Sequence, residues 1–133
     1  ISYLGLAREN DLQLKLLRIF QVYGEGEPES RLWPSLRRAA LSGSDFPMSE
    51  GGQLRDFIPV EEVAKTFIRA LDFQNAKPGM PIIEHVATGH PQTVLEFCQY
   101  WWNHWQAKGQ LIIGSLPYRH NEMMRVVTSS TSL

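Results

Sequence analysis

The stretch "LRDFIPVEEVAKTFIRAL", from Leu54 to Leu71, joins a strand-like segment to a helical one. Its first residues, "LRDFIPV", read as a short strand. Behind Pro59 the apolar residues recur at the spacing i, i+3, i+4, i+7, i+8 and i+11: Val60, Val63, Ala64, Phe67, Ile68 and Leu71. This period places them on one face of an amphipathic helix. The stretch therefore predicts a strand that leads directly into a helix with one buried face.

On both sides of this stretch, strand patterns alternate with helical patterns. "LKLLRIFQV", from Leu14, and "IIEHVATG", from Ile82, are nearly continuous apolar runs, which are typical of strands buried on both faces of a parallel sheet. We expect one helix over residues 33–41 and a second between a cap at Thr93 and a stop at Gly109. A further strand is expected in "LIIGSLPYR", a turn in "NAKPGMP", and a frayed end in "VVTSSTSL". The alternation predicts an α/β fold, in which ligands bind beyond the carboxyl ends of the strands.

Composition narrows the function classes. The 133 residues are 43% hydrophobic and 20% charged, as in one compact domain. A net charge of -1 argues against a nucleic-acid partner, and no apolar run is long enough to span a membrane. The single cysteine, Cys98, excludes an internal disulfide, so we expect a cytoplasmic protein. The four histidines show no metal-ligand spacing.

A glycine-rich, acidic loop follows the first predicted strand. In "YGEGEPES", Gly24 and Gly26 allow a sharp turn at the end of that strand. A phosphate-binding loop is a weak interpretation, because the glycine spacing is wrong and the carboxylates of Glu25, Glu27 and Glu29 would repel a phosphate.

Five motifs, in this order, carry a family resemblance: "LLRIFQVYGEGE", "LWPSLRRAALSG", "LRDFIPVEEVAKTFIRAL", "EHVATGHPQTVLEF" and "LPYRHNE". Together they resemble the C-terminal, substrate-binding half of the NAD-dependent sugar epimerases and dehydratases, within the extended short-chain dehydrogenase/reductases. The resemblance covers nearly all of Leu12 to Arg125. "RDFIPVEEVA" is its most specific element, with Glu62 where the family usually has Asp.

The resemblance implies the C-terminal part of a Rossmann-like α/β fold that lacks the first cofactor-binding strands. Residues 1–24 would be the tail of the catalytic helix and a late strand of the sheet. Residues 25–133 would form the substrate-binding region, with 82–88 returning to the sheet. The family's dinucleotide loop and its catalytic Y-x-x-x-K are missing, since Tyr3 is followed four places later by Ala7. We therefore expect no catalytic residue here, and NAD bound mainly by the absent half.

Several positions match residues that bind the nucleotide-sugar in the family. Gln21 takes the place of an asparagine near the diphosphate, although it also fits a polar residue at a strand end. Arg55 and Arg119 would bind the phosphates, and Glu122 would accept a ribose hydroxyl. The alternatives are an ion pair between Arg55 and Asp56, and a solvated charged face for Arg119 and Glu122.

Apolar positions complete the expected site. Leu32 would touch the nucleotide, and Phe46 and Met48 would lie beside its base. Ile19 and Phe20 stand where the family chain passes the nicotinamide, but as side chains they also fit a hydrophobic core. The helical spacing of Phe97, Trp101 and Trp105 favours packing over sugar stacking for the aromatic cluster of residues 97–105.

The main hypothesis is the substrate-binding portion of an NAD-dependent epimerase or dehydratase that acts through a 4-keto sugar and is inactive alone. Its partner would be a nucleotide-diphosphate sugar. An alternative is a stand-alone, non-catalytic module that binds nucleotide-sugars or another protein, and a redox-sensing regulator is disfavoured. Without its neighbours the sheet would have an open edge, so we expect self-association or a homo-oligomer.

Overall fold

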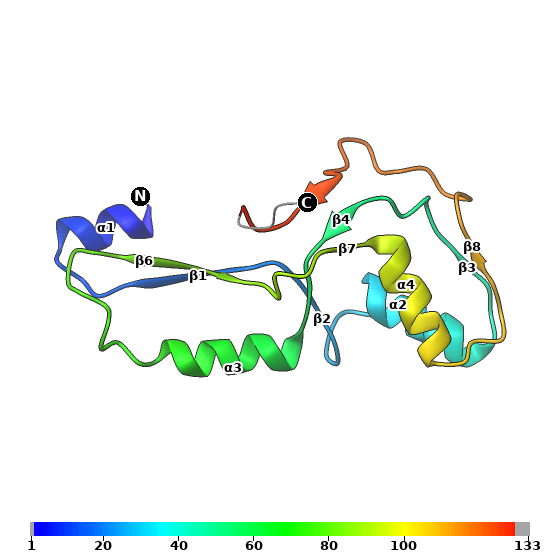
Figure 1. Cartoon of the computed structure of the whole chain (residues 1–133), viewed down its shortest axis with the longest axis horizontal. Helices are drawn as coiled ribbons and strands as arrows, with labels where there is room; N and C mark the ends of the chain where they lie inside the picture. The colour runs from blue at the N-terminus through cyan, green and yellow to red at the C-terminus, as the bar shows by residue number, and fades with distance from the viewer. Residues whose placement is uncertain (1, 130–133) are drawn as a thin grey trace.

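The computed structural model describes residues 2–129 and shows an elongated α/β molecule (Figure 1). One end carries the helix α1 (Tyr3–Glu9), the parallel strands β1 (Lys15–Ile19) and β6 (Ile82–Val86), and the helix α3 (Val60–Ala70). The other end carries the helices α2 (Leu32–Ser42) and α4 (Val94–His104). No helix within residues 2–129 is long and apolar enough to cross a membrane.

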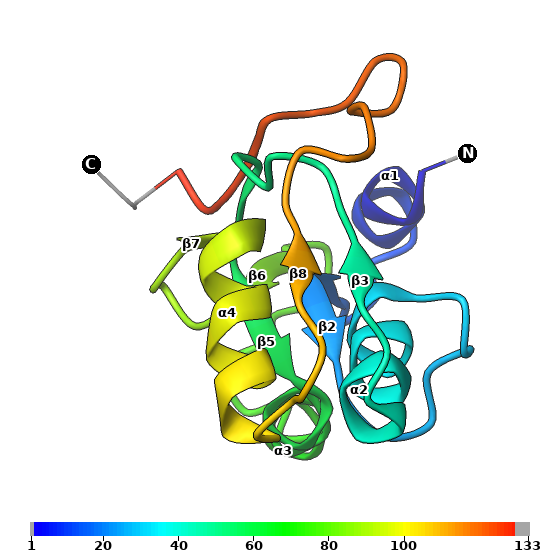
Figure 2. The ribbon, with the colours of Figure 1, turned by 90° about the vertical axis from the view of Figure 1, so that its right-hand side faces the viewer.

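Short strands connect and cover the two ends. β2 (Gln21–Tyr23) pairs in parallel with β5 (Phe57–Pro59), and β3 (Phe46–Pro47) pairs in parallel with β8 (Leu111–Ile112). β4 (Leu54–Arg55) lies between antiparallel β7 (Gln92–Thr93) and parallel β9 (Arg125–Val126). Figure 2 shows the α2–α4 end, where β3 and β8 run side by side in front of the helix pair. The α/β class is confirmed, and the chain matches part of a larger fold.

The predicted strand from Leu14 is two strands that pair with different partners. The Phe20 amide donates to the carbonyl of Val86 on β6 at 3.2 Å, whereas the next amide, that of Gln21, donates to the carbonyl of Asp56 at 3.1 Å. The chain thus leaves β6 at Phe20 and joins β5. The expectation of one continuous strand was wrong, because the apolar run contains no sign of where the partner changes.

The predicted strand "LRDFIPV" is also divided, at Asp56. Its carboxylate is fully buried and accepts hydrogen bonds from the Thr88 amide and hydroxyl, both at 2.8 Å, and from the Gly89 amide at 2.7 Å. A buried carboxylate requires such partners, and the turn that provides them ends the strand.

Burial on both faces of β1 and β6 was predicted and is wrong for this chain. Ile19 on β1 is 43% exposed and Ile83 on β6 is 42% exposed. On α3, Val63 is buried against Ile58 and Val86, while the second half of the expected buried face is open to solvent. The apolar pattern was read correctly, but the layer that would cover it is not among residues 2–129.

The core lies mainly between α2 and α4. One cluster of buried residues contains Leu36, Ala40, Met48, Cys98 and Trp102. A second contains Trp33, Phe57 and Phe97, with the Phe57 and Phe97 rings stacked at 3.9 Å between centroids. Phe97 and Trp102 are thus buried in the core and Trp101 and Trp105 pack against it, as predicted, whereas Tyr100 is 61% exposed. Burial also raises the pKa of the Cys98 thiol to about 12.

The ends of α4 and of the chain were predicted with mixed success. Thr93 caps α4 through a reciprocal pair with Glu96, as expected. The helix ends at His104, before the predicted stop at Gly109. The prediction of a frayed end over residues 126–133 was wrong for the part that the structure describes, because Val126 lies in β9 and Thr128 is buried. Residues 130–133 lie outside the described residues.

Gly24 gives the first prediction. It has a positive φ of 142°, and a Cβ at this position would lie 2.7 Å from Val60 Cγ1; at Gly26, φ is 93° and no atom lies within 4 Å of such a Cβ. Both Gly24→Ala and Gly26→Ala incur backbone strain, but only the first adds a steric clash. We expect Gly24→Ala to lower the free energy of unfolding by about 1–3 kcal/mol more than Gly26→Ala, in denaturant unfolding followed by tryptophan fluorescence. Equal losses would contradict this contact.

Candidate functional site

A cavity of about 520 Å³ opens between β2, β3, β4, the start of α2 and the segment 116–122. We call it the main cavity. The residues that the sequence predicted to bind substrate all line it: Gln21, Leu32, Phe46, Met48, Arg55, Arg119 and Glu122. They come from segments far apart in the chain, so the fold brings together positions that were selected from separate motifs.

The backbone explains why these segments meet. Leu54 on β4 donates to the carbonyl of Met124 at 2.8 Å, and Leu116 donates to the carbonyl of Met48 at 3.2 Å. The Gly52 amide donates to the hydroxyl of Tyr118 at 3.0 Å. These bonds hold the segment 116–124, drawn in orange in Figure 1, beside β4 and over the main cavity.

Arg55 lies at the inner wall, and only 14% of its side chain is exposed. Its Nη2 contacts Glu122 Oε1 at 3.2 Å and donates to the Met123 carbonyl at 2.6 Å, and its Nη1 donates to the Leu54 carbonyl at 3.0 Å. The alternative of an Arg55–Asp56 ion pair was wrong, because the Asp56 carboxylate is occupied by Thr88 and Gly89.

Arg119 and Glu122 differ in their surroundings. Arg119 is exposed on the rim of the main cavity. Glu122 is largely buried, with 19% of its side chain exposed, and accepts from Arg55 and from Gln53 Nε2 at 3.3 Å. The alternative of a solvated charged face therefore describes Arg119 but is wrong for Glu122.

The apolar wall of the main cavity is also part of the core. Met48 is only 5% exposed and belongs to the α2–α4 cluster, and Phe46 packs against Trp102 at 6.4 Å between ring centroids. Leu32, at the start of α2, is half-buried. These side chains give the cavity an apolar part of its lining.

Sequence reasoning missed five polar residues that line the main cavity: Ser30, Ser35, Ser49, Gln53 and Tyr118. Of these, Gln53 is nine-tenths buried. Gln53 directly precedes β4, and no pattern in the sequence singled it out.

Ile19 and Phe20, the predicted nicotinamide neighbours, do not line the main cavity. Ile19 is 43% exposed, and the Phe20 ring lies 5.4 Å from that of His85. The alternative of a core position does not hold for Ile19.

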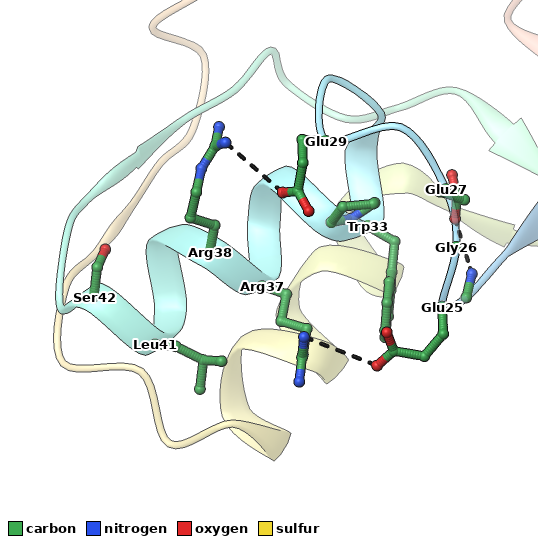
Figure 3. A pocket seen from close by; sticks show the side chains of 11 residues that line it. Glu25, Gly26, Glu27, Glu29, Trp33, Arg37, Arg38, Leu41 and Ser42 are labelled. Atoms are coloured by element: carbon green, nitrogen blue, oxygen red, sulfur yellow. Dashed lines mark hydrogen bonds and ion pairs between the residues drawn. The ribbon is translucent and has the colours of Figure 1, made fainter.

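A second cavity, of about 520 Å³, lies between the glycine-rich loop and α2 (Figure 3). Here Glu25 Oε1 lies 3.8 Å from Arg37 Nη1, and Glu29 Oε2 lies 3.7 Å from Arg38 Nη1. Glu27 Oε1 accepts from the Gly24 amide at 2.8 Å. The acids thus bind the loop to α2 and to itself, which explains why glycines and acids occur together after β2.

A buried tyrosine and the possible metal ligands bear on whether this part of the chain could catalyse a reaction. The pKa of Tyr23 is raised, first by burial and then by Tyr100 and Glu61, so its phenol is protonated at neutral pH and is not a ready base. No group of three or more His, Cys, Asp or Glu side chains suited to a metal ion occurs within residues 2–129.

Comparisons with known proteins identify a family. The model of the "NAD dependent epimerase/dehydratase family" matches residues 3–84. UDP-arabinose 4-epimerase 1 of Arabidopsis thaliana is 29% identical over 118 residues, covering 72% of this chain and 27% of that protein. A probable UDP-arabinose 4-epimerase 3 of Oryza sativa subsp. japonica is 32% identical over 109 residues, covering 65% of this chain and 26% of its own length. The chain therefore spans about a quarter of the curated relatives that it matches.

Solved structures show the same fold. UDP-N-acetylglucosamine 4-epimerase from Methanobrevibacter ruminantium M1, in complex with UDP-N-acetylmuramic acid, superposes with a TM-score of 0.80 at 23% identity over 96% of this chain and 41% of that one. UDP-glucose 4-epimerase from Thermotoga maritima, with UDP-glucose, superposes with a TM-score of 0.78 at 20% identity. The match covers 94% of this chain and 40% of that one.

Proposed function

We propose that this chain, which belongs to the NAD-dependent epimerase/dehydratase family, is the nucleotide-sugar-binding portion of such an enzyme. The observation that carries the proposal is the single cavity lined by every residue selected for substrate binding. Its volume lies within the range of small-molecule sites.

The charges of the main cavity suit a diphosphate. Arg31, Arg55 and Arg119 line it together with one acid, Glu122, so positive charge exceeds negative by two. Arginine is well suited to phosphate because its planar guanidinium offers paired donors. Arg55 would bind from the inner wall and Arg119 from the rim, with Gln21 beside them as an amide donor.

The apolar part of the lining suits a base. Leu32, Phe46 and Met48 present apolar and polarisable surface, against which a planar base can pack. We therefore place the diphosphate at the arginines and the base at these residues.

In the intact enzyme, residues 1–24 would continue the catalytic helix and a late Rossmann-like strand, with 82–88 in the same sheet and the rest of 25–133 around the substrate. NAD, held mainly by the other half of the enzyme, would supply the hydride chemistry at C4 of the sugar for a reaction through a 4-keto sugar. Ile19 ends β1 at an exposed position, the half-buried Phe20 follows it, and both would approach the nicotinamide. This chain would hold the nucleotide-sugar and supply no catalytic base.

A second candidate rests on the same cavity. A stand-alone, non-catalytic module would need the nucleotide-sugar site but neither the cofactor loop nor the catalytic pair. In the first proposal, this chain takes part in turnover when further protein supplies the cofactor loop and the catalytic pair. In the second, it binds the nucleotide-sugar without turnover.

The site assignment is tested by calorimetric titration with UDP. We expect Arg55→Ala to weaken UDP binding about tenfold or more, because it removes a charged, largely buried donor. Arg37→Ala is the matched control, since Arg37 pairs with Glu25 beside the second cavity and should leave UDP affinity unchanged. Equal affinities for wild type and Arg55→Ala, with both proteins folded, would refute the role of Arg55.

Catalysis is tested by incubating the chain with NAD and a UDP-hexose or UDP-pentose. We expect no epimer by NMR and no change in nicotinamide absorbance. UDP-glucose 4-epimerase from Thermotoga maritima is a suitable positive control. Turnover by this chain alone would overturn the assignment of an inactive portion.

The exposed apolar surface predicts association. β1 and β6 pair only with each other among residues 2–129, and Phe67, Ile68 and Leu71 on or beside α3 are 45%, 69% and 76% exposed. We expect the sedimentation coefficient to rise with protein concentration, because association removes this apolar area from water.

Ile68→Glu should reduce that rise. Leu41→Glu is the control, since Leu41 is 61% exposed but lies on α2 at the other end of the molecule. A monomer at every concentration would contradict the prediction.

A further inference from the structure

Residues 113–124, which we call the strap, connect β8 to β9 and form one wall of the main cavity (Figure 1). β8 pairs with β3 and β9 pairs with β4, so both ends of the strap are anchored. Between those ends no strap residue is buried, and only Glu122 is half-buried. The strap is therefore held by polar contacts rather than by a core, and such segments open at low free energy.

The backbone of the strap is bonded to one segment, residues 48–55. Near its start, the Leu116 amide donates to the Met48 carbonyl at 3.2 Å. At its end, the Leu54 amide donates to the Met124 carbonyl at 2.8 Å. Because both bonds face the same segment, the strap can leave that segment without disturbing any other element.

Tyr118 fastens the strap between these two backbone bonds. Its hydroxyl accepts from the Gly52 amide at 3.0 Å, while 37% of the residue is exposed. The bond is thus open to competition from water. Loss of this one hydroxyl would weaken the closed arrangement and leave the backbone bonds on either side in place.

The other side of residues 48–55 is fixed. The carbonyls of Gly51 and Gln53 accept from the amides of Leu95 and Val94, both at 2.9 Å. These two amides lie at the start of α4, which contributes buried residues to both core clusters of the α2–α4 end. The same short segment is therefore bonded to a well-packed helix on one side and to an exposed strap on the other.

Opening of the strap would change the main cavity at Arg55. This side chain is only 14% exposed, and its Nη2 is held by Glu122 at 3.2 Å and by the Met123 carbonyl at 2.6 Å. Both partners belong to the strap. When the strap leaves residues 48–55, the cavity loses one wall and the Arg55 guanidinium loses both contacts.

We propose that the strap is a lid of the main cavity, that it opens as one unit, and that it thereby controls access to Arg55. The Tyr118 hydroxyl is the latch of this lid. The proposal goes beyond the proposed function, because the opening is a property of the free chain and requires no particular ligand.

Hydrogen exchange of single amides, measured by NMR on the full chain and corrected for intrinsic rates, tests the lid. The strap amides, Leu54 and Leu116, should exchange at least about tenfold faster than the α4 amides, Val94 and Leu95. Tyr118→Phe removes only the latch hydroxyl. We expect it to speed exchange of both strap amides about three- to tenfold, although neither bonds to Tyr118, and to leave the α4 amides unchanged.

Tyr100→Phe is the matched control. Tyr100 is 61% exposed on α4, and removal of its hydroxyl should leave exchange of the strap amides at the wild-type rate.

Access to Arg55 is measured by its modification with phenylglyoxal, mapped by mass spectrometry. We expect Tyr118→Phe to speed this modification by about the same factor as the exchange of the strap amides, because both processes require the open lid. Arg37, whose side chain is 44% exposed beside the second cavity, should be modified at an unchanged rate.

Three results would overturn the proposal, and none of them involves nucleotide binding. Strap amides as slow as the α4 amides in wild type would exclude the lid, and this comparison needs no variant to fold. Faster exchange in Tyr118→Phe that is confined to Gly52, whose own bond is lost, would show a local contact instead of one opening unit. Faster strap amides with unchanged modification of Arg55 would exclude control of access.

Discussion

The buried carboxylate of Asp56 is the constraint on which the rest of the site depends. It accepts hydrogen bonds from Thr88 and Gly89, just after β6, while its backbone carbonyl accepts from Gln21 at the start of β2. One residue thus joins the β1–β6 end of the molecule to the strands of the cavity. Because its side chain is turned toward Thr88 and Gly89, the preceding residue, Arg55, can face the main cavity.

The helices α3 and α4 were predicted from the sequence, because helical spacing and a capping residue can be read from neighbouring residues. Helical spacing identified α3, and the Thr93 cap identified the start of α4. The breaks at Phe20 and Asp56 were missed, because they arise from a change of pairing partner that no single segment encodes. β9 was missed for the same reason: Val126 is held by β4, more than half the chain away.

The residues of the site could be predicted where a sequence motif marks their positions. Motif order placed Gln21, Arg55 and Glu122 in one site, and the fold brings them to one cavity. It did not reveal that Glu122 engages both Arg55 and Gln53, because such a network depends on how the segment 116–124 lies beside β4. Arg55 is therefore partly neutralised in this structure, so any anion that binds Arg55 must share its guanidinium with Glu122 or displace that carboxylate.

Packing is unevenly distributed between the two ends. The α2–α4 end contains two buried clusters, joined by half-buried side chains that include Trp101 and Trp105, whereas the β1–β6 end buries only Ile58, Val63 and Val86 as a cluster. Local stability follows buried apolar contacts, so the β1–β6 end should open at lower free energy than the end that carries the cavity wall. The walls of the main cavity are thus held in shape by the core between α2 and α4, while the β1–β6 end has fewer buried contacts to hold it.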